Sequence, residues 1–242
     1  MQTVLITGAR SGLGLSLSRA FLAHGWYIVA VGRNISETPD DVRTNPNTLL
    51  KEVELTDDAS LRALAADLRD TPVDILINNA GIYDTSSVDD DGVVSTLNNI
   101  TRVFAVNAAA PRLLADLLLP NLELGSERLL VGISSGMGTF AQLFGHDFET
   151  TSRGTSGYEA THWVYSASKT ALNYGLLSFG VLHPTVKVSL INPGWMQTAI
   201  GGLGAPLSPD DCAAAIVELL LNHRARLPAS RLVNHLGHVM EL

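Results

Sequence analysis

The sequence is poor in cysteine, in basic residues and in long apolar runs, and each shortage excludes a class of protein. Cys212 is the only cysteine of the 242 residues, so the chain cannot form an internal disulfide. The 16 Lys and Arg are outnumbered by 24 Asp and Glu, which gives a formal net charge of −8 at pH 7. This charge repels a phosphate backbone, and no basic stripe with interleaved aromatic residues offsets it. We therefore expect no nucleic-acid partner.

Signals for membrane insertion, secretion and metal binding are also missing. Pro, Gly or a charge breaks each apolar segment before it reaches the roughly 18 residues that a membrane span needs. The first residues, Met1-Gln2-Thr3, carry neither the basic region nor the cleavage site of a signal peptide. The seven histidines are scattered, and His235 and His238 lack a third ligand, so no metal is expected. We expect a cytoplasmic protein without membrane association, with residues 1–242 forming one domain.

Apolar strand patterns alternate with helical patterns along the whole chain. The sequence predicts strands at 3–7, 27–31, 48–53, 73–77, 128–133, 186–191 and near Leu232, and helices at 13–21, 57–68, 93–119, 166–181 and 209–221. Strands that are apolar throughout belong inside a parallel sheet covered on both faces. The fold class is therefore α/β, a Rossmann-type doubly wound parallel sheet of about seven strands, with ligands at the carboxyl ends of the strands.

A glycine-rich segment follows the first predicted strand and indicates a dinucleotide cradle. Glycines allow a tight turn there, and backbone amides at the start of a helix attract a diphosphate. The spacing is G-x-x-x-G-x-G rather than the general G-x-G-x-x-G, and a simple glycine turn is the alternative. The predicted contacts are Gly8, Arg10, Ser11, Gly12, Leu13 and Gly14.

The end of the second strand bears on the choice of cofactor. An NAD enzyme commonly has an acid there for the ribose diol, whereas this chain has Gly32-Arg33-Asn34. Arg33, helped by Arg10, is placed to pair with a 2′-phosphate, although a solvated surface arginine is the plainer interpretation. We expect NADP(H) in preference to NAD(H).

Tyr165 and Lys169 are four positions apart on one predicted helix and therefore share a face. A phenol has a pKa near 10, and a neighbouring cation lowers that pKa and lets the phenol exchange protons with a substrate oxygen. The chain has only three lysines, so the spacing rarely arises by chance. A purely structural pair is the alternative.

Other polar residues are predicted to gather at the same edge. Asn79, Ala80 and Gly81 leave the strand at 73–77 beside the cofactor cleft, and Ser134-Ser135 end the strand at 128–133, where a hydroxyl can hydrogen-bond a reacting carbonyl. Asn107 lies four residues before Pro111, which has no N–H to bond the Asn107 carbonyl. This predicts either a simple helix kink or, with the Tyr–Lys pair nearby, a place in a proton relay.

Together these segments resemble the short-chain dehydrogenase/reductase family, whose T-G-x-x-x-G-x-G, N-N-A-G, Y-x-x-x-K and P-G motifs occur here in order. The resemblance implies Tyr165 as the catalytic acid/base, Lys169 as its pKa-lowering and ribose-binding partner, Ser135 as the substrate-orienting hydroxyl, with Ser134 as second choice, and Asn107 as the relay residue. It also implies cofactor contacts from Glu54 and Leu55 and, in Asn192-Pro193-Gly194-Trp195-Met196-Gln197-Thr198, from Pro193, Gly194, Met196 and Thr198.

Thirty positions separate Ser135 from Tyr165, many more than in most family members, so an insertion around 136–162 is expected to cover the mouth of the active site. This length and the wording of the P-G segment resemble the carbonyl-reductase and C-factor-like branch. Apolar residues of the insertion, with Trp195, are predicted to line the substrate pocket or else to pack the insertion down: Met137, Phe140, Phe144, His162 and Trp163.

The predicted function is NADPH-dependent reduction of a ketone or aldehyde to an alcohol, or the reverse, by a Ser-Tyr-Lys-Asn tetrad. The partner is a small-molecule carbonyl or alcohol, and a homodimer or homotetramer is possible. A cofactor-binding regulator with little catalysis is the first alternative. Gly132 to Gly136 also match G-x-S-x-G of serine hydrolases, with Asp210 and His235 in the right order. A sugar-nucleotide epimerase would need a different glycine spacing and a longer C-terminal domain.

Overall fold

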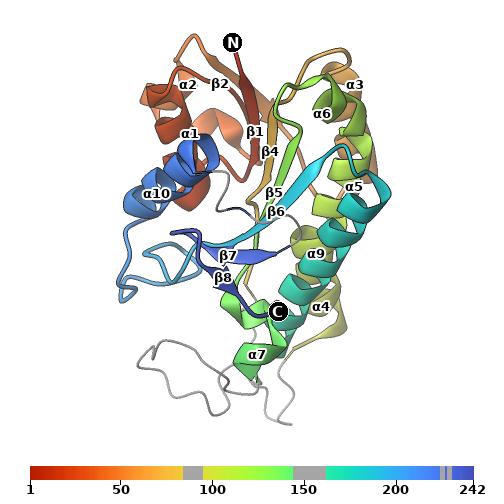
Figure 1. Ribbon diagram of the computed structural model, residues 1–242, viewed down its shortest axis with the longest axis vertical. Helices are drawn as coiled ribbons and strands as arrows, with labels where there is room; N and C mark the ends of the chain where they lie inside the picture. Colours follow the sequence, from red (N-terminus) through yellow and green to blue (C-terminus); the bar gives the residue numbers. More distant parts are fainter. Residues whose placement is uncertain (84–94, 144–161, 224–226, 228–230) are drawn as a thin grey trace.

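The sheet is the centre of the molecule, and its strands are parallel except at one edge (Figure 1). The computed structural model describes residues 1–83, 95–143, 162–223, 227 and 231–242. Within them an eight-stranded sheet runs in the order β3-β2-β1-β4-β5-β6-β7-β8. The strands are β1 Thr3–Thr7, β2 Tyr27–Gly32, β3 Thr48–Glu52, β4 Ile75–Asn78, β5 Leu129–Ile133, β6 Lys187–Asn192, β7 Leu232–Asn234 and β8 Val239–Met240. The predicted doubly wound α/β fold is confirmed.

The central strands are buried along their whole length, as their uninterrupted apolar sequences predict. Every residue of β1, β4 and β5 is buried, because helices cover both faces of the sheet. The sheet has one strand more than the approximate seven that were expected. The additional strand, β8, pairs antiparallel with β7. It is only two residues long and Val239 is exposed, so the sequence contains no apolar run that would predict this strand.

Two layers of helices enclose the sheet (Figure 1). α1 (Gly12–Ala23) and α10 (Pro209–Asn222) pack together on one face, while α3 (Asp58–Asp67), α5 (Ala110–Leu117) and α9 (Trp163–Leu182) cover the other. A hydrophobic core lies between the sheet and each helix layer, and successive residues of a strand point to different cores. Ile6 packs in the core beside α1 and α10, and Leu5 packs in the core beside α5 and α9. The shorter helical segments are η1 Ile35–Glu37, α2 Asp40–Arg43, α4 Leu97–Phe104, α6 Leu119–Leu124, η3 Gly136–Gly138 and α7 Phe140–Leu143.

The helix predicted over 93–119 is not one regular helix. α4 is followed by a π-helical turn, η2 (Ala105–Ala109), and then by α5, which ends at Leu117. Pro111 has no N–H for the Asn107 carbonyl, and its ring would clash with that carbonyl in a regular α-helix. A wider turn relieves this conflict, and such turns occur frequently at functional sites. The break predicted at Asn107 is therefore a π-turn.

The order of the strands places a crevice next to β1. β1 lies between β2 and β4, so the connections leaving β1 and β4 run to opposite faces of the sheet, and ligands bind at such a switch point. In the described residues, no helix has both the length and the apolar character needed to cross a membrane.

Candidate active site

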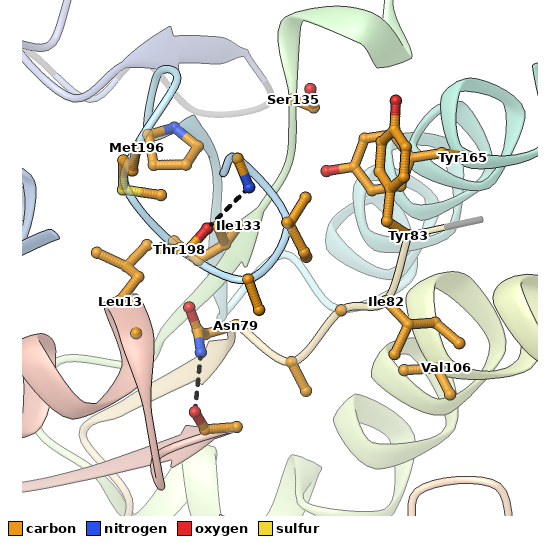
Figure 2. A pocket seen from close by; sticks show the side chains of 18 of the residues that line it. Leu13, Asn79, Ile82, Tyr83, Val106, Ile133, Ser135, Tyr165, Met196 and Thr198 are labelled. Atoms are coloured by element: carbon orange, nitrogen blue, oxygen red, sulfur yellow. Dashed lines mark hydrogen bonds between the residues drawn. The ribbon is translucent and has the colours of Figure 1, made fainter. Parts of the chain in front are cut away.

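A large cavity opens at the carboxyl ends of β1, β4, β5 and β6, with a volume of about 1410 Å³. Residues of both predicted groups line it: the glycine loop except Gly14, and Ser135, Tyr165 and Lys169. Figure 2 shows that Leu13 and Thr198 approach it from one side and Tyr83 and Tyr165 from the other. The sheet topology thus brings together segments that are up to 190 positions apart, from Gly8 to Thr198.

The glycine loop forms a narrow floor for this cavity. Gly8 and Gly12 have positive φ angles of 69° and 54°, which glycine adopts without strain. A Cβ on Gly14 would lie 2.3 Å from the Gly8 carbonyl oxygen, so only glycine allows α1 to pack this closely against the loop. Gly14 does not line the cavity, unlike the other predicted loop contacts. Ser11 precedes α1 without a side-chain cap, so the first amides of the helix face the cavity without a side-chain acceptor.

Thr7 fixes the loop that follows β4. Its Oγ1 accepts hydrogen bonds from the backbone N–H groups of Asn79 and Ala80, both at 3.0 Å. The Asn79 side chain donates to the Thr7 carbonyl oxygen at 2.8 Å. These bonds hold Asn79, Ala80 and Gly81 at the cavity wall, where the sequence predicted them.

Charged side chains gather at the end of the cavity beside β2 and β3. Arg10 pairs with Glu37 at 2.6 Å, and Arg33 approaches Glu54 with an Nη1–Oε2 distance of 3.7 Å. Hydrogen bonds from Thr56 are the main cause that lowers the pKa of Glu54, and the charges of Arg33 and Arg102 act in the same direction. Arg33 is more than half exposed and its partner is distant, so its guanidinium is available to an anion.

Tyr165 and Lys169 lie one turn apart on α9, as predicted, and both are buried at the cavity wall. Lys169 Nζ donates to the Ile133 carbonyl oxygen at 2.8 Å and lies 5.7 Å from the centre of the Tyr165 ring. Burial lowers the pKa of Lys169 to about 8. Burial also raises the pKa of Tyr165 to about 12, and a hydrogen bond with Ser135 opposes this rise. The expected lowering of the phenol pKa is therefore wrong for this structure, because desolvation of the phenolate outweighs its stabilisation.

The two serines after β5 have different partners. Ser134 is buried, and its Oγ donates to Asn173 Oδ1 at 2.5 Å. Ser135 Oγ accepts from the Met137 N–H at 3.2 Å and interacts with the Tyr165 phenol. Figure 2 shows Ser135 and Tyr165 on the same part of the cavity. The arrangement favours Ser135 over Ser134 as the residue that meets a substrate oxygen.

Asn107 lies behind this wall and is completely buried. Its side chain bonds the backbone N–H and carbonyl of Ile82 and donates to Ser168 Oγ at 3.0 Å, and Ser168 in turn donates to the Tyr165 carbonyl oxygen at 2.7 Å. A Cβ on Gly81 would lie 3.5 Å from both Asn107 Oδ1 and Lys169 Nζ, so these two groups converge behind Gly81. Asn107 therefore connects the π-turn, α9 and the loop after β4.

Only some of the residues predicted for the substrate pocket line the cavity. Met137 and Trp195 line the cavity, and His162 reaches it indirectly by packing on Tyr83 with ring centres 5.3 Å apart. Phe140 and Trp163 do not line it and are 60% and 44% exposed. Phe144 lies outside the described residues, as does most of the insertion at 136–162.

Sequence reasoning missed several lining residues: Ile82, Tyr83, Arg102, Val106, Gln142 and Ile200 to Leu203. Tyr83 is the most notable of them, because its ring packs on Tyr165 with centres 4.7 Å apart and planes at 44°. Tyr83 lies two residues after Gly81 of the Asn79-Ala80-Gly81 segment, and this closeness in the sequence was the available signal.

Sequence similarity to known proteins identifies the family of this chain. A sequence profile of the family described as short chain dehydrogenase matches residues 2–203. The chain belongs to the short-chain dehydrogenase family. The C-signal protein of Myxococcus xanthus is 30% identical over 167 residues, which cover 66% of this chain and 87% of C-signal. The resemblance that the motifs indicated is thus confirmed.

Solved structures give the same result at the level of the fold. The NADPH-bound carbonyl reductase from chicken fatty liver is 25% identical, with a TM-score of 0.83 and coverage of 100% of this chain and 99% of that one. The carbonyl reductase Sniffer of D. melanogaster is 26% identical, with a TM-score of 0.82 and complete coverage of both chains. This short-chain dehydrogenase is an oxidoreductase that acts on CH–OH and C=O groups of small molecules with a nicotinamide cofactor.

The hydrolase alternative finds no support in the site. Ser134 donates to Asn173, and Asp210 accepts from Ser16 Oγ at 2.5 Å, so neither is paired as a nucleophile or an acid of a triad with His235. Gly136 begins a three-residue 3₁₀ turn, η3, rather than the helix that a nucleophile elbow requires. In the part of the chain that the structure describes, no group of three His, Cys, Asp or Glu is placed to hold a metal ion.

Proposed function

We propose that this short-chain dehydrogenase reduces a ketone or aldehyde to an alcohol with NADPH, and that Tyr165, Lys169, Ser135 and Asn107 carry the reaction. The observation that supports this most is the position of the Tyr165 phenol. The phenol lies beside Ser135 in the same cavity into which the glycine loop opens, and the buried Lys169 Nζ is 5.7 Å from the centre of the Tyr165 ring.

The residues present fit a nicotinamide dinucleotide. The uncapped amides at the start of α1 suit its diphosphate, and glycine at position 14 keeps the loop tight enough to leave room for it. Met196 and Thr198 line the cavity beside the glycine loop and are placed for the nicotinamide, and a Cβ on Gly12 would lie 3.5 Å from the Thr198 side chain. When bound, the nicotinamide supplies or accepts the hydride.

Arg33 is the basis for the preference for NADPH. It is exposed at the end of β2, beside the ribose position, and the chain has no acid at that strand end. Arg10 contributes less than the sequence suggested, because Glu37 already pairs with it at 2.6 Å. One guanidinium with a distant partner is enough to favour a 2′-phosphate over a hydroxyl.

Side chains of the protein then donate the proton that the reaction requires and stabilise the phenolate that remains. With a pKa of about 12, the Tyr165 phenol is protonated at neutral pH, so it donates to an alkoxide as it forms. Ser135 donates to the same oxygen and orients the carbonyl. The Lys169 charge stabilises the phenolate that is left, and we assign Asn107, which converges with Lys169 behind Gly81, to hold the water through which a proton returns to Tyr165.

The test combines turnover with binding. NADPH oxidation is followed with a panel of ketones and aldehydes, and NADPH binding is followed by fluorescence titration. Tyr165→Phe is expected to abolish turnover while leaving the NADPH dissociation constant within about twofold, because a single hydroxyl at the substrate side is removed. Tyr174→Phe is the matched control, since Tyr174 lies on the same helix and is 79% exposed. Near-normal reductase activity of Tyr165→Phe contradicts the proposal, and NADPH binding without turnover of any carbonyl favours the regulator alternative.

A further inference from the structure

The cavity has two chemically different ends. Among its described lining residues, the charged ones are Arg10, Arg33, Glu54, Arg102 and Lys169. Four of these belong to the β2–β3 end, because Glu54 interacts electrostatically with Arg33 and Arg102, and Arg10 pairs with Glu37. Lys169 is buried and donates to the Ile133 carbonyl. The end at which Tyr165 and Ser135 meet a substrate therefore offers no exposed charge from the described residues.

Apolar and aromatic side chains form that second end. Ile82, Val106, Met137, Trp195 and Ile200 are among the residues that line the cavity, and Ile200 is 42% exposed. Figure 2 shows Ile82 and Val106 on the same side of the cavity as Tyr83 and Tyr165. The described residues of this end offer no exposed cationic partner to a carboxylate or phosphate on the substrate, so we expect charged substrates, which would lose hydration here, to be disfavoured.

Tyr83 gives this end its particular shape. Its ring covers the ring of Tyr165, with centres 4.7 Å apart, and is itself covered by the His162 ring at 5.3 Å. The rings of Tyr83, Tyr165 and His162, which come from the loop after β4 and from the start of α9, thus pack together as one wall. The wall is fixed in place, because Asn107 holds both backbone groups of Ile82, the residue before Tyr83.

We infer that Tyr83 is a specificity-determining residue and that the substrate is a neutral carbonyl compound with an aromatic ring next to the reacting carbon. This inference rests on the proposed function. A carbonyl oxygen between Tyr165 and Ser135 leaves its substituent beside Tyr83, where an aromatic ring gains stacked or edge-to-face contacts that a saturated ring lacks. We therefore expect this preference for an aromatic substrate to depend on Tyr83 and not on the catalytic groups.

The experiment compares acetophenone with cyclohexyl methyl ketone, which share a carbon skeleton and differ in the saturation of the ring. Because conjugation alters intrinsic reactivity, the informative quantity is the ratio of their kcat/KM values in each variant, divided by the ratio in the parent. Tyr83→Leu keeps apolar bulk without a ring and is expected to lower this ratio about 3- to 10-fold, chiefly through KM of acetophenone. Tyr83→Phe keeps the ring and is expected to preserve the ratio within about twofold.

A charged analogue tests the other half of the inference. 4-Acetylbenzoate is acetophenone with a carboxylate, and its KM in the parent is expected to be at least about 10-fold higher. An unchanged ratio in Tyr83→Leu, or 4-acetylbenzoate bound as well as acetophenone, overturns the inference. Thermal unfolding and NADPH titration check that each variant is folded, and Tyr83→Met replaces Tyr83→Leu if the latter does not fold.

A binding measurement separates this inference from the proposed function. The dissociation constants of both neutral ketones are measured by NMR titration of the protein with NADP⁺ present. If the parent reduces no ketone and no aldehyde, the proposed function fails. The inference is then decided by binding: tighter binding of acetophenone that is lost in Tyr83→Leu supports it, and equal binding of the two ketones overturns it.

Discussion

The side-chain amide of Asn107 bonds both backbone polar groups of Ile82: Oδ1 accepts from the N–H at 2.8 Å, and Nδ2 donates to the carbonyl oxygen at 2.9 Å. The pair joins the π-turn to the loop that carries Gly81 and Tyr83. Asn107 therefore positions the cavity wall, in addition to the relay role proposed for it.

Replacement of Asn107 by leucine should reduce stability as well as activity. Leucine has a similar size but leaves the Ile82 N–H and carbonyl without their partner, which is expected to lower the free energy of unfolding by about 2 kcal/mol. Urea denaturation measures this change. Full stability of Asn107→Leu with lost turnover would show that the residue acts in proton transfer alone.

Arg33→Ala should change cofactor choice rather than cofactor binding in general. Loss of a charge-assisted bond to a 2′-phosphate is expected to raise the NADPH dissociation constant about 5- to 10-fold and to leave the NADH constant unchanged. Arg62→Ala is the matched control, because the Arg62 side chain is also 61% exposed and pairs with Asp58 on α3. Equal NADPH and NADH affinities in the parent would refute the preference.

The buried ammonium of Lys169 should make stability depend on pH. Its folded pKa of about 8 lies below the ordinary value of 10.5, so the unfolded chain binds the proton more tightly. The resulting penalty is fully present below pH 8 and is relieved as pH rises toward 10.5, so the free energy of unfolding should rise by roughly 1 kcal/mol between pH 7 and pH 9. Lys169→Met should lack this rise. Identical pH slopes for the two proteins would show that Lys169 is not desolvated.

Gly14→Ala should disrupt the cradle although alanine favours helices. The added Cβ would lie 2.3 Å from the Gly8 carbonyl oxygen and 2.6 Å from Asn79 Nδ2, so loop and helix must separate. We expect a lower melting temperature and weaker NADPH binding. Gly175→Ala in α9 is the contrasting control: its Cβ would have only one ordinary contact, at 3.8 Å from Arg112, and should stabilise the helix by about 0.5–1 kcal/mol. A harmless Gly14→Ala would refute the close-packing argument.

Most of the fold could be predicted because its strands are buried on both faces. The interiors of β1, β2 and β5 are apolar throughout, β6 is interrupted only by Ser189, and each strand has glycine, proline or polar residues at its ends, so their positions were found within one or two residues. β8 could not be found, since two half-exposed residues carry no periodicity. The π-turn at Asn107 was predicted only as a break, because Pro111 marks the lost hydrogen bond without specifying how the backbone relieves it.

The site residues could be predicted where a single short sequence motif contains several of them. Tyr165 with Lys169 and the Gly8 loop each required only local spacing, and they meet at the cavity as expected. The wall around Tyr83 was missed because it depends on contacts between α9, the loop after β4 and the π-turn. The pKa of Tyr165 was misjudged for a similar reason: the spacing to Lys169 was visible in the sequence, but the degree of burial was not.

Because the exposed charges among the described lining residues lie at one end of the cavity, we expect ionic strength to affect the binding of the cofactor and the binding of the carbonyl substrate differently. Binding at the Arg33 end depends on exposed charges, whose attraction added salt weakens, with a screening length of about 10 Å at 0.1 M. Contacts beside Tyr83 involve uncharged surfaces, and excluded salts such as sulfate strengthen the burial of such surfaces. Raising the sulfate concentration will therefore raise the KM for the cofactor while lowering the KM for the carbonyl compound, in one and the same protein.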